Sequence, residues 1–256
     1  MTDQDYEYGG MIASNWDLLR GDTSDWPDRF FFRNIIADGG QPALEVGCGT
    51  GRLLLDYLSE GLDVDGVDVS PEMLELCRKN AKDLGLRPTL YQQAVESLDV
   101  PRKYRTIFIP SSSFQLVTDL TDAQTALERC YRHLLIGGRL VMSIMDVSQD
   151  AAKGWQVVAE AHRPQDGLLV RRWLNSEYDP EAQLEHTQDR YELLDEGRVV
   201  ASEEYKRSPA TRGYSLGQIN KMMETAGFQE VRAVSDFSEE PASEDDSIFC
   251  VFGTRA

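Results

Sequence analysis

Three glycines at alternate positions, Gly47, Gly49 and Gly51, are the residues whose type and spacing most directly suggest chemistry. Glycine is needed where the backbone must turn with a positive φ or must let a ligand lie against it. The acid Glu45 comes two residues before the first glycine, and Asp68 follows 21 residues after it. An acid at that distance, closing the second strand of a βαβ unit, is placed to meet a ribose. The pattern therefore predicts a site for a nucleoside-containing ligand.

The elements that would position these residues alternate between strands and helices. An apolar run at 43–46 breaks into the glycines, and a helix-compatible run follows at 52–60. The next helix has Ser70 as its N-cap, Pro71 at its first position and Gly85 at its end. Further strands are expected at 62–68, 89–91, 106–109, 139–145, 231–234 and 248–252, and further helices at 121–135, capped by Thr121, and at 215–226. This alternation predicts an α/β fold with a doubly wound, mainly parallel sheet.

Two segments depart from this rhythm. Residues 1–38 look helical and rich in aromatic side chains, and we expect them to form a helical lid. Residues 146–214 contain three extended runs, 168–178, 183–194 and 199–207, separated by turn-forming residues. They predict an antiparallel three-stranded insert that covers a substrate or serves as a dimer surface. Both segments are expected to belong to one domain spanning 1–256.

The glycine motif and three later motifs resemble those of class I S-adenosylmethionine-dependent methyltransferases. Glu-x-Gly-x-Gly-x-Gly resembles the first motif of that family, and residues 66–74 resemble its successor. Residues 133–140 resemble the late helix, turn and fifth strand, with Ile136 where proline is usual, and residues 224–228 resemble the last helix and turn. The resemblance covers most of 43–145 and 215–255 and implies a seven-stranded Rossmann-like sheet. An NAD-linked oxidoreductase is the competing interpretation, but its Gly-x-Gly-x-x-Gly spacing is not present here.

The resemblance implies a set of cofactor-binding positions. Glu45 would lie near the ammonium group, and Asp68 would take both ribose hydroxyls, although a structural role for Glu45 and a solvated Asp68 are the alternatives. The third strand lacks the acid that often binds adenine, so the backbone of Ala94 and Val95, or Gln93, would read the base. The full set implied for S-adenosylmethionine, and for the product S-adenosylhomocysteine, is Glu45, Gly47, Cys48, Gly49, Gly51, Asp68, Val69, Met73, Ala94, Val95 and Pro110.

Residues that could contact a methyl acceptor are more scattered. The serine-rich loop 110–115 follows the fourth strand and lacks an Asn-Pro-Pro-Tyr motif, which argues against methylation of nucleic-acid bases. His186 and Asp146 are candidate bases for a hydroxyl acceptor, whereas an amine must only be unprotonated. A lone histidine on a strand is more often structural. Candidate substrate-binding residues are Tyr8 and Trp16 in the lid, together with Tyr6, then Phe114 in the loop, and Arg171, Arg212 and Tyr214 in or beside the insert. Helix packing for the lid aromatics and carboxylate pairing for the arginines are the alternatives.

Composition excludes several function classes. The 26 basic and 44 acidic residues give a net charge of −18, which disfavours a nucleic-acid partner. No apolar run approaches the ~20 residues needed to cross a bilayer, so no membrane partner is expected. The four cysteines are scattered and the three histidines are not at ligand spacing, so we expect reduced thiols, no metal and a cytoplasmic location.

These observations predict an enzyme that transfers a methyl group from S-adenosylmethionine to a small molecule, with nitrogen ahead of oxygen as the acceptor. The alternatives are a cofactor-binding regulatory protein without turnover and a protein methyltransferase. The expected oligomeric state is monomer or homodimer.

Overall fold

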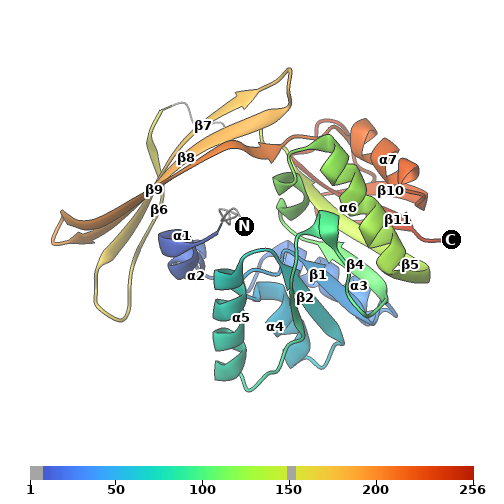
Figure 1. The fold of residues 1–256 in the computed structure, drawn as a ribbon, viewed down its shortest axis with the longest axis horizontal. Coiled ribbons are helices and arrows are strands. Elements are labelled where there is room, and N and C mark those ends of the chain that lie inside the picture. The colour runs from blue at the N-terminus through green and yellow to red at the C-terminus, as the bar shows by residue number, and fades with distance from the viewer. Residues whose placement is uncertain (1–7, 149–153) are drawn as a thin grey trace.

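The computed structural model describes residues 8–148 and 154–256 and contains two separate sheets (Figure 1). The larger sheet has seven strands in the order β10-β11-β5-β4-β1-β2-β3. All neighbouring pairs from β5 to β3 are parallel, whereas β11 runs antiparallel between β5 and β10. The strands are β1 (Ala43–Val46), β2 (Val64–Asp68), β3 (Leu90–Gln92), β4 (Tyr104–Ile109), β5 (Leu134–Met145), β10 (Gln229–Ser235) and β11 (Ile248–Thr254). The predicted seven-stranded α/β sheet is confirmed.

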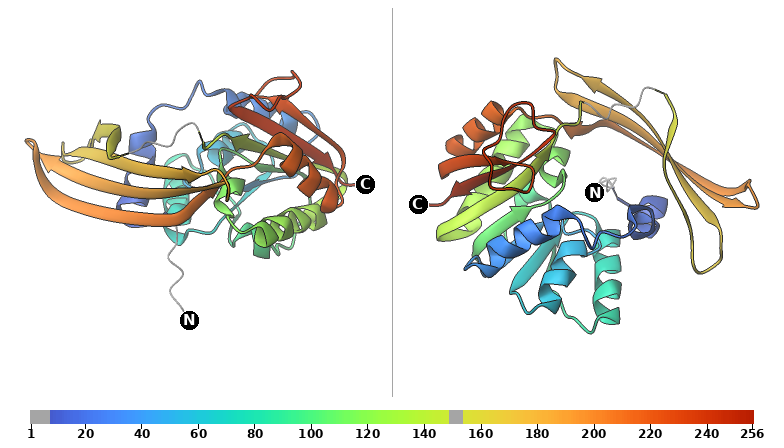
Figure 2. Two further views of the ribbon diagram at one scale, coloured as in Figure 1. Left: turned by 90° about the horizontal axis from the view of Figure 1, so that it is seen from above. Right: turned by 180° about the vertical axis from the view of Figure 1, so that it is seen from behind.

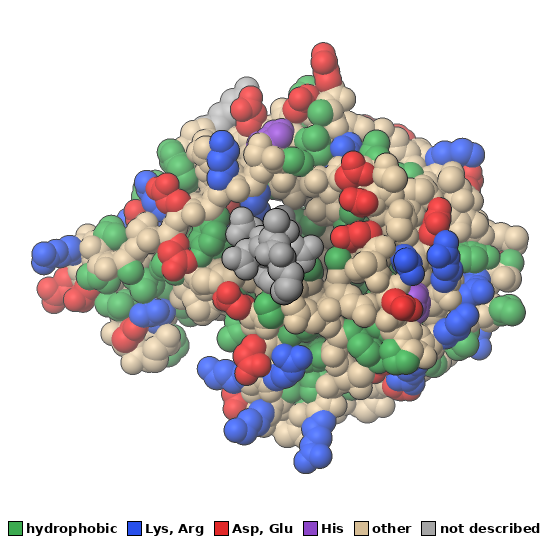
Figure 3. Space-filling view, in the orientation of Figure 1, with side chains coloured by type: hydrophobic (Ala, Val, Ile, Leu, Met, Phe, Trp, Pro, Cys, Tyr) green, Lys and Arg blue, Asp and Glu red, His purple; other side chains and the backbone are tan. Residues whose placement is uncertain are grey.

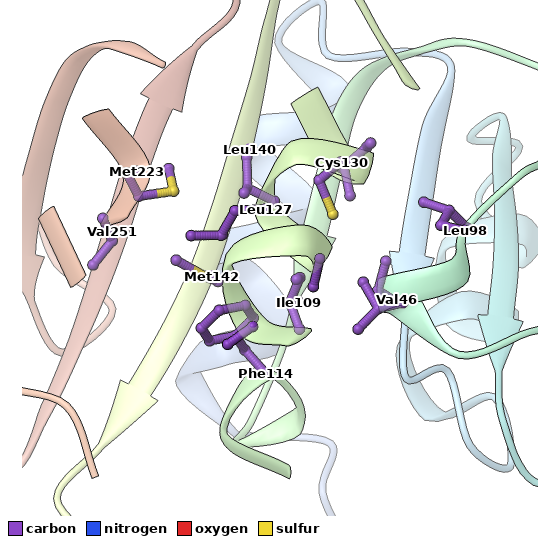
Figure 4. Packing of buried hydrophobic residues seen from close by; sticks show 14 of the residues in the cluster. Val46, Leu98, Ile109, Phe114, Leu127, Cys130, Leu140, Met142, Met223 and Val251 are labelled. Atoms are coloured by element: carbon purple, nitrogen blue, oxygen red, sulfur yellow. The ribbon is translucent and has the colours of Figure 1, made fainter. Parts of the chain in front are cut away.

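Helices cover both faces of this sheet. One face packs on α3 (Pro27–Ala37), α4 (Arg52–Ser59) and α5 (Pro71–Asp83), and the other on α6 (Leu120–His133) and α7 (Leu216–Thr225). Figure 4 shows the second face, where Leu127 and Cys130 of α6 lie over Leu140 and Met142 of β5. Two short 3₁₀ helices, η1 (Val95–Ser97) and η2 (Ser113–Leu116), follow β3 and β4. None of the helices that the structure describes is long and apolar enough to cross a membrane.

The second sheet is antiparallel and projects from the first as an arm (Figures 1 and 2). It has four strands: β6 (Gln156–His162), β7 (Leu169–Asp179), β8 (Leu184–Asp195) and β9 (Arg198–Arg212). The three predicted runs correspond to β7, β8 and β9, but the prediction of three strands was wrong because it missed β6. The space-filling view shows hydrophobic side chains on the surface of the arm (Figure 3). The exposed hydrophobic residues on its edge strands include Val157, Val158, Val199 and Val200.

Two local predictions differ from the structure. The N-cap of α6 is Asp119, whose carboxylate accepts the backbone N–H groups of Thr121 and Asp122, so the cap lies two residues before the predicted Thr121. The expected turn at Ile136–Gly138 lies inside β5, which begins directly after α6. Gly137 takes a φ of +72° there, and the register with β4 shifts at this point. Ser70 caps α5 as predicted, since its hydroxyl accepts the N–H of Met73.

The helical N-terminal region divides into two parts with different positions. The helices α1 (Gly10–Ser14) and α2 (Trp16–Arg20) lie between α5 and the arm (Figure 1). In contrast, α3 is part of the main core, because Phe32 and Ile36 are fully buried against residues such as Phe108. Within the described residues, therefore, only 8–20 occupy the position expected of a lid.

We expect Phe32→Ala to destabilise the protein by about 3–5 kcal/mol, because the substitution leaves a cavity under the sheet. The neighbouring Phe30 is 47% exposed, and Phe30→Ala should change stability by no more than about 0.5 kcal/mol. Urea unfolding of both variants measures the difference. Equal losses for the two variants would mean that α3 does not belong to the core.

Candidate functional site

A cavity of about 460 Å³ opens where β1, β2 and β4 end. Ligands of open α/β sheets bind at this carboxyl edge. The lining comes from the glycine turn after β1, the ends of β2 and β3, the loop after β4, the start of α6, and the N-terminal residues Tyr8, Trp16 and Arg20. Ten of the predicted cofactor residues line the cavity: Glu45, Gly47, Cys48, Gly49, Asp68, Val69, Met73, Ala94, Val95 and Pro110.

The three glycines have different local requirements. All three adopt positive φ angles, 74° at Gly47, 52° at Gly49 and 91° at Gly51. A Cβ atom at Gly47 would lie 2.7 Å from the Ser113 hydroxyl oxygen, and one at Gly51 would lie 2.7 Å from the Cys77 sulfur. A Cβ at Gly49 would meet no protein atom within 4 Å. Gly51 therefore permits packing behind the turn and does not line the cavity, whereas Gly49 leaves open space where a ligand can approach the backbone.

Asp68 ends β2 with its carboxylate held by two backbone donors. The N–H of Gly49 donates to Oδ2 at 2.8 Å, and the N–H of Ser70 donates to Oδ1 at 2.9 Å. Burial raises the pKa of Asp68, and these hydrogen bonds oppose that increase. The two bonds fix the direction of the carboxylate relative to the glycine turn before any ligand binds.

Glu45 is a buried acid whose Oε2 atom has no hydrogen-bond partner among the described residues. Its side chain is only 3% exposed, yet it lines the cavity. Burial raises its pKa to about 8, despite the opposing charge of Arg52. The Arg52 guanidinium forms an ion pair with Asp28, so its charge is already compensated. An unpartnered buried acceptor is unfavourable, and a cationic group in the cavity would satisfy it.

Arg20 is a cavity residue that the sequence analysis missed. Its guanidinium carbon lies 4.7 Å from the ring centroid of Trp16 and 6.0 Å from that of Trp26. No carboxylate in the described part of the chain forms an ion pair with it. Burial and the nearby Arg52 lower its pKa. The spacing of Trp16 and Arg20, four residues apart on a predicted helix, was the available signal for this contact.

The N-terminal segment 8–20 closes one side of the cavity through bonds to both of its neighbours. On the side of the main domain, the Ser70 hydroxyl donates to the Tyr8 carbonyl at 2.7 Å, and the Thr50 hydroxyl donates to the Asp17 carboxylate. On the side of the arm, the N–H of Met11 donates to Glu203 and to the Tyr205 hydroxyl. The rings of Tyr8 and Trp16 meet edge to face, and both line the cavity. Tyr6 lies outside the described residues.

The remaining predicted substrate and catalytic residues do not line the cavity. His186 and Arg171 lie on the face of the arm opposite to Tyr191, which packs on α1. His186 meets the Ser208 hydroxyl at 2.7 Å, and Arg171 pairs with Glu160. Asp146 follows β5, where its carboxylate accepts the N–H of Ser148 at 2.9 Å.

The other three predicted residues lie in or beside the loop after β4 without lining the cavity. Phe114 and Tyr214 are buried against each other, with ring centroids 5.6 Å apart. Arg212 donates from Nε to the Thr118 carbonyl at 2.6 Å, at the back of a cavity-lining segment. These residues support the wall of the cavity from outside.

Comparison with known proteins agrees with this geometry. Residues 43–138 match a family model described as "Methyltransferase domain". A glycine/sarcosine N-methyltransferase from Parasynechococcus marenigrum is 26% identical over 91% of this chain and 80% of its own length. A ubiquinone biosynthesis O-methyltransferase from Photorhabdus laumondii is 30% identical, but the match spans only 58% of this chain and 63% of the relative.

Solved structures show the same fold over nearly the whole chain. An S-adenosylmethionine-dependent methyltransferase from Clostridium acetobutylicum has a TM-score of 0.74 at 19% identity, covering 91% of this chain and 92% of its own. The structure of S-adenosylmethionine-bound CalS10, an amino pentose methyltransferase from Micromonospora echinaspora, has a TM-score of 0.69 at 18% identity, covering 97% and 98%. Residues 43–138 therefore form a methyltransferase domain, and the glycine turn and the strand order give the chain the fold of the class I S-adenosylmethionine-dependent methyltransferases.

Proposed function

We propose that this enzyme methylates the amine nitrogen of a small molecule. The observation that carries the proposal is the charge of the cavity. Its lining includes the acids Asp68, Glu96, Asp119 and Asp122, in addition to the protonated Glu45, against Arg20 and the already paired Arg52. Asp119 and Asp122 are exposed at its edge. A cleft lined mainly by negative charge raises the local concentration of cationic molecules, and most small amines are cations in solution.

The side chains that line the cavity also favour nitrogen rather than oxygen as the atom that accepts the methyl group. All three histidines lie in the described part of the chain, and none lines the cavity. A hydroxyl acceptor profits from a general base, whereas an amine that has released its ammonium proton to solvent carries its own lone pair and takes over the positive charge of the sulfonium as the methyl group is transferred. We therefore assign no base, and neither His186 nor Asp146 is placed in this role. The N-methyltransferase relative matches nearly the whole chain, while the O-methyltransferase relative matches about three fifths of it.

The residues around the glycine turn fit the cofactor. S-adenosylmethionine supplies a methyl group on a positively charged sulfur. We propose that Glu45 binds its ammonium group through the unpartnered Oε2 and that Arg20 binds its carboxylate. Asp68, already oriented by Gly49 and Ser70, would bind the ribose hydroxyls. Val69, Met73, Gln93 and the backbone of Ala94 and Val95 would surround adenine.

The acceptor would then occupy the space bordered by residues 111–113, Tyr8 and Trp16. The aromatic faces of Tyr8 and Trp16 suit a positive charge, with each contact worth roughly 0.5–2 kcal/mol. Orientation of acceptor and donor is the main contribution expected of the protein, worth about 7–11 kcal/mol in effective-molarity terms.

Glu45 makes cofactor binding dependent on pH. Its raised pKa, about 8, means that the carboxyl carries a proton at neutral pH in the free enzyme. The cofactor's ammonium group favours the ionised form, so binding should release a proton. Affinity for S-adenosylhomocysteine should rise from pH 6 to pH 8, by at most about tenfold per pH unit.

Calorimetry in two buffers of different ionisation enthalpy measures this proton release. Glu45→Gln should bind more weakly and lose the dependence on buffer and pH. Asp122→Asn changes an exposed acid of the cavity and is the matched control. It should keep the wild-type affinity and the wild-type dependence on buffer and pH. A wild-type affinity that stays flat or falls between pH 6 and pH 8 would contradict the assignment of Glu45 to the ammonium group.

Arg20→Met should weaken binding of S-adenosylhomocysteine by about 10- to 100-fold, because a charge-assisted bond to the carboxylate is lost. Binding of 5′-methylthioadenosine, which has no amino acid group, should not change. Arg78→Met removes an exposed arginine from α5 and serves as the control. If Arg20→Met weakens both ligands equally, the residue acts on the lid as a whole and does not bind the carboxylate.

The amine assignment is tested by measuring S-adenosylhomocysteine formation with matched acceptors. The panel pairs amines with the corresponding alcohols: glycine with glycolate, ethanolamine with ethylene glycol, and glucosamine with glucose. Turnover is expected with an amine and not with its alcohol partner, and with a rate that rises as the free-base fraction of the amine increases. Turnover confined to a hydroxyl compound would refute the proposal.

A further inference from the structure

The loop after β4 borders the acceptor side of the cavity in an unusual backbone conformation. Ser111 has a φ of +57°, which is uncommon for a residue other than glycine and carries a conformational cost. Its carbonyl accepts the hydroxyl of the fully buried Ser143 at 2.7 Å. Ser111, Ser112 and Ser113 all line the cavity. The conformation of this loop therefore decides where the serine groups lie relative to an acceptor.

Gln115 holds the far end of this loop. Its side chain is completely buried and makes three hydrogen bonds. Nε2 donates to the carbonyls of Met145 and Arg212, both at 2.9 Å, and Oε1 accepts the N–H of Met145 at 2.8 Å. These bonds use both donors of the amide and its acceptor.

The two partners of Gln115 are the points where the chain leaves and re-enters the main domain. Met145 is the last residue of β5, before the chain passes to the arm, and Arg212 is the last residue of β9, where it returns. Gln115 itself is 30 residues from Met145 and 97 residues from Arg212 in the sequence. One side chain thus joins both ends of the arm to the loop that borders the cavity.

We infer that Gln115 is a positioning residue that sets the geometry of Ser111–Ser113 and ties it to the position of the arm. The inference rests on the proposed function, because it assigns the acceptor to this side of the cavity. A tilt of the arm would move Met145 and Arg212 relative to each other, and the amide cannot keep all three bonds when they separate. The loop, and with it the acceptor wall, then follows the arm, while Glu45, Asp68 and the glycine turn stay in place.

The test compares Gln115→Met, which keeps the size of the side chain, with Gln115→Glu, which keeps an acceptor for the Met145 N–H but can donate to no more than one of the two carbonyls. The control is Gln124→Met, since Gln124 on α6 also donates to a backbone carbonyl, that of Met222. S-adenosylhomocysteine affinity should be unchanged in all three variants. Turnover of the best amine in the panel should fall by about 10- to 100-fold in both Gln115 variants through kcat, because the acceptor is misplaced.

Hydrogen exchange provides a measurement that does not depend on the acceptor. In both Gln115 variants, the rate of backbone amide exchange should increase in residues 111–117 and in residues 207–212. In the control variant Gln124→Met, it should increase in neither segment. Increased exchange in only one segment would contradict the coupling, and so would unchanged exchange. Unchanged kcat would contradict the positioning role. If turnover by the wild type is confined to a hydroxyl compound, the proposed function fails, and the exchange result alone decides whether Gln115 joins the arm and the loop.

Discussion

The hydrogen bond between the Gly49 N–H and the Asp68 carboxylate is the interaction on which the site depends. It joins the turn after β1 to the end of β2, and the Val67 carbonyl supports it by accepting the N–H groups of Gly47 and Cys48. The turn can form only because glycines supply three positive φ angles within five residues. Once this corner is fixed, Glu45 is buried behind it, and the cavity opens in front of it at the carboxyl edge of the sheet.

The other walls of the cavity are held by hydrogen bonds between segments that are distant in the sequence. The segment 8–20 is bonded to Ser70 and Thr50 on one side and to Glu203 on the other, so it connects the corner at Asp68 with the arm. None of the residues that line the cavity belongs to the arm. Within the described chain, the arm therefore contacts the cavity walls through the segment 8–20 and the loop after β4. The sequence predicted an insert that covers a substrate or serves as a dimer surface, and that role stays a prediction, although Arg171 does not line the cavity.

The sequence predicted best what depends on local signals. The glycine turn, the Ser70 cap and the alternation of strands and helices are encoded within a few residues, and all three are present in the structure. The strand β6 was missed because its residues are mostly exposed and include Glu160 and His162, so no buried alternation marks it. Arg20 was missed because its environment is created by Trp26 and the cavity, which come together only on folding. The faces of His186 and Arg171 depend on strand register, which the sequence of a polar insert specifies weakly.

The two sides of the cavity are held by hydrogen bonds of very different sequence separation. The corner formed by the glycine turn and Asp68 is built from segments adjacent in sequence, and its bonds span about 20 residues, such as the 19 between Gly49 and Asp68. The loop after β4 and the segment 8–20 are held by bonds spanning 97 residues from Gln115 to Arg212 and 192 from Met11 to Glu203. Under the proposed function, substitutions in the arm can therefore alter the proposed acceptor wall while the bonds that orient Asp68 remain intact. The Gly49–Asp68 corner and the loop after β4 therefore depend on different parts of the chain, whereas Arg20, the proposed contact of the cofactor carboxylate, lies on the segment 8–20 that also bonds to the arm.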